Sequence, residues 1–179
     1  MSNTIFIIIG LVVLIIFFFS VAVIHIRSLR DDIDKRWYNL ADKLEYRQDM
    51  VPNLIETARL FIPPEQITSD NDLIAKTIET RANAGKNVKL GSDKIIQEHD
   101  LSKQINDLFA LGQKYEILGK STNYLELKKE FKDINAEIEK LSHDFNDKVR
   151  HHNGVISRPY NIVPSMILGF KRLQIFEFE

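Results

Sequence analysis

The 179-residue chain has 24 Lys and Arg against 25 Asp and Glu, interleaved along the sequence without a basic stripe, so its charge pattern argues against a nucleic-acid partner. It has no cysteine, which excludes a disulfide framework, a thiolate metal site and a cysteine nucleophile. Beyond its apolar beginning it is rich in Lys, Glu, Asp, Leu and Ile and poor in Gly and Pro, a composition typical of helical proteins.

The first element is an uncharged apolar run that begins at Ile5 and ends at Ile24 and predicts a transmembrane helix over residues 5–26. About 20 apolar residues in a helix extend roughly 30 Å, which matches the hydrocarbon core of a bilayer. A cleaved secretory signal is the alternative, because Ser20 and Ala22 are small residues of the kind found at a cleavage site. The length of the run and the lack of a basic residue before it favour a retained anchor in the lipid bilayer.

The orientation of this anchor is predicted by the basic residues around it. None precedes the run, whereas Arg27, Arg30, Lys35 and Arg36 follow it. Since Lys and Arg flanks stay preferentially on the cytoplasmic side, we expect a single-pass protein with residues 1–4 outside and a cytoplasmic domain.

After the anchor, apolar residues at helical spacing predict a first helix over residues 27–62, in which Arg47 interrupts the apolar stripe. Pro52 lies inside this helix and removes an amide donor, which predicts either a kink near Gln48 or a split into two helices. The pair Pro63-Pro64 is expected to end it.

The rest of the chain predicts three further helices and an apolar tail, over residues 69–85, 92–118, 123–158 and 160–179. Ser69 or Asp70 is expected to cap the second helix, Gly85 to end it and Gly119 to end the third, while residues 86–91 are expected to form a mobile surface connection. Two long and two shorter helices predict an all-α fold, an elongated antiparallel four-helix bundle in a domain spanning residues 27–179.

The tail has closely spaced apolar residues from Ile162 to Phe170, too many to remain in solvent. We expect it to cover the end of the bundle, so that deleting residues 160–179 lowers the melting temperature. Docking on a partner or on the bilayer surface is the alternative.

One run of this sequence carries a family resemblance: residues 47–57 read RQDMVPNLIET. This run resembles the Asp-x-Ile/Val-Pro-Asn-Leu-Val-Glu-Thr signature of the LemA family, membrane-anchored bacterial proteins in which it follows an N-terminal transmembrane helix. Later family landmarks occur in the same order, at Asn146, Asn153, Pro159, Gly169, Phe170, Phe176 and Glu177. The chain departs from the family at Phe145 and His152, which replace two tyrosines, and at Arg158, which replaces a phenylalanine.

The resemblance implies a helical bundle on a single-pass anchor in the bacterial inner membrane. Members of the family look like non-enzymatic scaffold or adaptor proteins and are often encoded near membrane metalloproteases. The resemblance therefore implies a membrane-protein partner, with homo-oligomerisation also open.

The residues themselves predict no catalysis, metal or cofactor. The five histidines are His25, His99, His143, His151 and His152, and none belongs to a His-Glu-x-x-His motif. His151 and His152 diverge by about 100° on a helix, and we interpret them as solvated. The alternative is a hydrolase-like enzyme with a hidden site near His152 and Glu56, the latter a potential buried carboxylate beside Asn53.

Several residues remain as candidates for partner contact or for fixing helix register: Pro52, Asn53, Glu56, Asn146, Asn153, Gly169 and Phe170. Asn146 and Asn153 are seven residues apart, so they project from the same side of the last long helix, where buried amides commonly fix register. Because Pro52 leaves the Gln48 carbonyl without its helical donor, Asn146 or Asn153 is a candidate donor to it.

Overall fold

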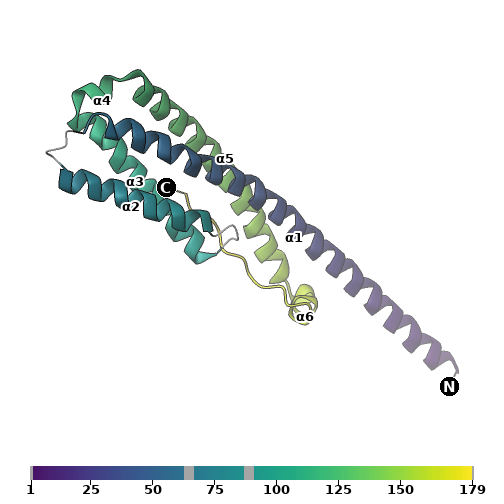
Figure 1. Cartoon of the computed structure of the whole chain (residues 1–179). Helices are drawn as coiled ribbons and strands as arrows, with labels where there is room; N and C mark the ends of the chain where they lie inside the picture. Colours follow the sequence, from purple (N-terminus) through teal and green to yellow (C-terminus); the bar gives the residue numbers. More distant parts are fainter. Residues whose placement is uncertain (1, 63–66, 87–90, 179) are drawn as a thin grey trace. The chain divides into compact units, whose positions relative to one another are not determined.

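The computed structural model describes residues 2–62, 67–86 and 91–178, and every regular element in these ranges is a helix (Figure 1). The predicted all-α class is therefore confirmed. The helices are α1 (Ser2–Arg59), α2 (Ile67–Lys86), α3 (Ser92–Lys114), α4 (Glu116–Lys120), α5 (Thr122–Ile156) and α6 (Pro159–Ile167).

The helix α1 is continuous over 58 residues, so the apolar run and the first polar helix of the sequence are one element. Its N-terminal part has an 18-residue window of mean hydropathy 3.4, none of it buried, with large side chains such as Phe18 62% exposed. Within the described ranges α1 is the one helix long and apolar enough to cross a membrane. Pro52 lies inside α1, so of the two alternatives predicted for it the split into two helices is wrong.

The boundaries of the middle helices differ from those predicted. The helix α2 begins at Ile67 and continues to Lys86, so Ser69 and Asp70 lie inside its first turn and Gly85 does not end it. Pro63-Pro64 and most of the predicted connection, residues 87–90, lie outside the described residues.

The third predicted helix is interrupted at Tyr115, whose backbone is extended (φ −112°, ψ 98°), and Gly119 lies within the short α4. A Cβ atom on Gly119 would lie 2.2 Å from the carbonyl oxygen of Gly112, and one on Gly112 would lie 2.2 Å from the hydroxyl of Tyr124. The Tyr124 hydroxyl donates a 2.5 Å hydrogen bond to the carbonyl of Phe109. The chain therefore reverses between α3 and α5 through a backbone contact that only glycines permit.

The described chain forms two compact units, each with segments distant in sequence. Unit 1 comprises the described residues of Met1–Arg36 and Phe145–Ile175, and unit 2 those of Trp37–Asp144 and Phe176–Glu179.

Unit 1 contains a small apolar cluster of Ile26, Val155 and Ile156, against which Leu29 and Phe170 pack. In the same unit, the side chain of Asn153 donates to the Leu173 carbonyl and accepts from the Leu173 amide, both at 2.9 Å. Gly169 has a φ of +70°, which lets the chain turn after α6 and return as the extended segment that Asn153 holds.

Unit 2 has the larger core, built from α1, α2, α3 and α5 and including Leu40, Leu44, Leu54, Ile74, Leu101, Leu108, Phe131 and Ile138. On the edge of this core Tyr46 donates a 2.7 Å hydrogen bond to Glu130, and that carboxylate raises the pKa of Tyr46. The end of the chain joins the core as well, because Phe176 is buried with its ring 5.8 Å from that of Trp37 in an edge-to-face contact.

Candidate functional site

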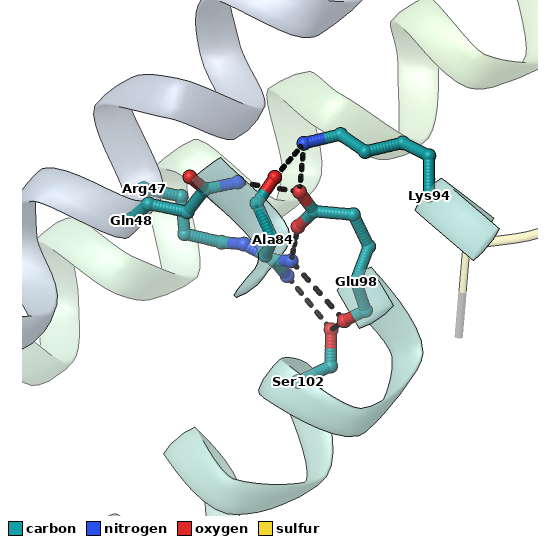
Figure 2. Close-up of polar contacts among 6 residues, drawn as sticks. All are labelled: Arg47, Gln48, Ala84, Lys94, Glu98 and Ser102. Carbon is teal, nitrogen blue, oxygen red and sulfur yellow. Dashed lines mark hydrogen bonds and ion pairs between the residues drawn. The ribbon is translucent and has the colours of Figure 1, made fainter. Parts of the chain in front are cut away.

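The interruption of the apolar stripe at Arg47 marks a buried ion network in unit 2 (Figure 2). The Arg47 side chain is 1% exposed, and its Nη2 lies 2.7 Å from Oε2 of Glu98 on α3. Its Nη1 donates a 2.9 Å hydrogen bond to the hydroxyl of Ser102, one helical turn further along α3. Arg47 therefore fixes α1 against α3 by two directed contacts.

The second oxygen of the Glu98 carboxylate completes the network. Its Oε1 accepts a 2.5 Å hydrogen bond from Nε2 of Gln48 and lies 2.7 Å from Nζ of Lys94. Lys94 also donates a 2.9 Å hydrogen bond to the carbonyl of Ala84, near the C-terminal end of α2, where carbonyls lack helical partners. The Glu98 carboxylate thus joins α1 to α3, and Lys94 links it to α2, in what we call the Glu98 network: Arg47, Gln48, Lys94, Glu98 and Ser102.

The network has two cations for one carboxylate, all at most 5% exposed, which requires compensation inside the protein. Burial lowers the pKa of Arg47, and the Glu98 charge opposes that shift. The ring of Phe178 lies over the guanidinium at 4.9 Å, a cation–π contact from the last part of the chain. The Arg47 guanidinium therefore faces aromatic electron density beside the Glu98 carboxylate, and the Lys94 ammonium faces the Ala84 carbonyl beside the same carboxylate.

Pro52 leaves the carbonyl of Gln48 without its helical donor, and the donor that replaces it differs from the one predicted. Nε of Arg81 on α2 donates a 2.6 Å hydrogen bond to the Gln48 carbonyl, and its Nη2 lies 3.0 Å from Oδ1 of Asp49. The sequence pointed to Asn146 or Asn153 for this role, and the structure has Arg81 in it. An arginine on the neighbouring helix satisfies this carbonyl, which helps α1 to continue through its proline.

The other predicted site residues divide between the two units. Asn53 and Glu56 are exposed on α1 in unit 2, so the suggestion of a buried Glu56 carboxylate is wrong, and Pro52 is half-buried. In unit 1, Asn146 is buried and Asn153 is half-buried. Gly169 and Phe170 also lie in unit 1, at the turn and the apolar cluster described above.

The histidine pair separates into one exposed and one buried ring. His151 is exposed, but His152 has no exposed surface, so its interpretation as a solvated residue is wrong. Burial lowers the pKa of His152, with smaller effects from Asn153, Arg30, Asp34 and His151. Its Nε2 has no hydrogen-bond partner among the described residues. These features favour a neutral imidazole in the folded protein.

Two open grooves lie on unit 2. The first, of about 630 Å³, has the rings of Phe109, Phe131 and Phe178 in its lining, together with Lys128, Lys132 and part of Arg47, and we call it the Phe178 groove. The second, of about 480 Å³, is lined by Tyr38, Ala41, Asp42, Glu45, Gln48, Asp49, Arg81, Ala82, Gly85 and Lys94. Within the described ranges, no three His, Asp or Glu residues converge as a metal site would require.

We expect Glu98→Gln to destabilise the protein by about 3–5 kcal/mol, because it leaves Arg47 and Lys94 as buried charges without a counter-ion. Glu116→Gln is the matched control, since Glu116 forms the same i,i+4 pair with Lys120 on the exposed surface of α4. Urea unfolding of the full chain in detergent, followed by circular dichroism, measures both variants. Equal stability of the two variants would contradict a structural role for the network.

We expect stability to fall as the pH drops below about 6.5, the ordinary pKa of histidine, because the unfolded chain then binds a proton that buried His152 does not. Between the lowered folded pKa and 6.5 the unfolded state is more protonated, so acidification favours unfolding. His152→Gln should reduce this pH dependence, whereas His151→Gln should not. Unfolding free energies measured across this pH range would refute the assignment if both variants kept the full slope.

Comparison with known proteins adds one finding to this geometry. The family model of the LemA family matches residues 36–179, which includes the whole Glu98 network and the tail with Phe178. A search of curated proteins gives no significant match. Because the match covers most of the sequence, the chain belongs to the LemA family.

Proposed function

We propose that this LemA-family protein is a single-pass, membrane-anchored scaffold or adaptor that acts by protein–protein interaction at the bacterial inner membrane and catalyses no reaction. The observation that carries the proposal is the change of environment along α1. Its first part is apolar and exposed, whereas from Ile26 onward the same helix buries its apolar stripe in protein. An exposed apolar helix of this length is suited to lipid, and the buried stripe to a folded domain.

The buried charges support a non-enzymatic role. Arg47, Lys94 and Glu98 are engaged with one another, so their first task is to hold three helices together. The alternative hydrolase site has weaker support, because Glu56 is solvent-exposed and lines neither groove, and His152 has no surface that a substrate can reach.

The Phe178 groove is the surface we assign to the partner. Aromatic rings in its lining offer apolar contact, and on α5 the positive charges of Lys128 and Lys132 exceed the one negative charge in the lining, that of Glu139. This combination suits a protein segment that presents apolar side chains beside acidic ones. The partner we propose is a membrane protein, with the metalloproteases associated with the family as first candidates.

Site-specific photo-cross-linking tests this assignment. We expect a photoreactive residue in place of Lys132 to give a cross-linked product with another membrane protein in intact cells, identified by mass spectrometry. The same residue in place of Lys120, exposed on α4 and away from the groove lining, is the control. A product containing only a second copy of this chain would replace the adaptor with a homo-oligomer, and no difference from the control would contradict the groove.

The orientation we propose has unit 2 in the cytoplasm, and it is supported by the basic residues that follow the apolar run. The chain has no cysteine, so a single introduced cysteine reports its own position. Ile117→Cys is suitable because Ile117 is 74% exposed on α4. We expect a membrane-impermeant maleimide to label this variant only after the cells are lysed. Labelling in intact cells would show that unit 2 lies outside the cytoplasm, which contradicts the proposed orientation but not the membrane anchor.

A further inference from the structure

A surface helix of a soluble protein normally buries its apolar side chains and exposes its polar ones. The helix α6 does the reverse. Its buried residues are small or polar, namely Asn161, Pro164 and Ser165. Its large apolar residues are on the exposed side: Tyr160 is 66%, Ile162 42%, Val163 59%, Met166 76% and Ile167 68% exposed. Water is a poor solvent for such a face, so some other apolar medium or surface should cover it.

The position of α6 within unit 1 indicates what that medium is. The C-terminal end of α5 packs Val155 and Ile156 against Ile26, two residues beyond the end of the apolar run of α1. The helix α6 begins only three residues after Ile156, and its Asn161 side chain donates a 3.0 Å hydrogen bond to the Val155 carbonyl. The exposed face of α6 therefore belongs to the part of unit 1 nearest the exit of the apolar run.

The charges next to α6 fit a membrane surface. Between Asp147 and Glu177 the sequence has no acidic residue. Arg158 directly precedes α6, Lys171 and Arg172 follow it closely, and all three are exposed. Basic residues beside an apolar helix face are typical of helices that lie in the interface of a membrane with anionic lipids.

We propose that α6 is an interfacial membrane helix: its face of Tyr160, Ile162, Val163, Met166 and Ile167 enters the headgroup region of the leaflet from which α1 emerges, and Arg158, Lys171 and Arg172 contact anionic headgroups. The inference rests on the membrane anchor of the proposed function and adds a second, lateral attachment to it. The tail thus has two parts with different tasks. Phe170 and Phe176 pack against protein, whereas α6 turns its large side chains to lipid.

Fluorescence quenching in vesicles tests the proposal with the full chain. Single-cysteine variants carry an environment-sensitive dye and are reconstituted into phosphatidylethanolamine and phosphatidylglycerol vesicles. Ile167→Cys reports on α6, Leu14→Cys on the apolar run, and Asp147→Cys on an exposed position of α5 in the same unit. All three positions are exposed, so the substitutions leave the packing of the protein intact.

We expect lipids with a nitroxide on the acyl chain to quench the dyes at Leu14 and Ile167 but not at Asp147. Iodide in the aqueous phase should quench the dye at Ile167 at least about threefold less than the dye at Asp147, as for a side chain buried at the lipid interface. Replacing phosphatidylglycerol with phosphatidylcholine should weaken the lipid quenching at Ile167, and unchanged quenching would overturn the assigned contact with anionic headgroups.

The remaining outcomes separate this inference from the proposed function. Lipid quenching at Leu14 with full iodide quenching at Ile167 would overturn the interfacial helix and leave the anchor standing. Protection of Ile167 from both quenchers would also overturn it, because a protein surface, such as a second copy, would then cover α6. A dye at Leu14 that lipid nitroxides do not quench would overturn the anchor and this inference with it.

Discussion

The fold of unit 2 depends on the buried carboxylate of Glu98. Arg47 reaches one of its oxygens from α1 and Lys94 reaches the other from the preceding turn of α3, so apolar packing alone does not set the register of these helices. Each buried charge is costly by itself, and removal of one leaves the others uncompensated. Such a network stabilises one arrangement of the helices against neighbouring registers in which the charges would lie unpaired.

The same region explains how a proline lies within a helix of 58 residues. Pro52 cannot donate to the Gln48 carbonyl, and Arg81 on α2 donates instead, while the Gln48 side chain donates to Glu98. The family signature around Pro52 therefore lies at the meeting point of α1, α2 and α3. Its conspicuous residues Asn53 and Glu56 are exposed, whereas Arg47 and Gln48, at its start, make the internal contacts.

Two kinds of attachment follow from the exposed surfaces. Unit 2 has a groove with aromatic and basic lining, which we assign to a protein partner, and unit 1 has an apolar run and an apolar face on α6, which we assign to lipid. The proposed contacts with protein and with lipid then both depend on exposed residues that do not belong to the core. The proposed scaffold role requires such surfaces, and the folded core then only has to hold them in place.

The sequence by itself determined the helical class, the apolar run and the approximate limits of the long helices, because apolar residues at spacings of three and four depend on local helix geometry alone. It also contains a signal for the buried charges of α3: Lys94 and Glu98 continue the spacing of Leu101, Ile105 and Leu108, which places them on the buried face of that helix. Only the tertiary structure decided that Arg47 pairs with Glu98 and that Arg81 donates to the carbonyl that Pro52 leaves free. It also decided that His152 is buried and that the large apolar side chains of α6 are exposed. A charged residue on an apolar helix face can form a buried ion pair or can lie exposed at the edge of that face. Which of the two occurs depends on the distant residue that packs opposite it.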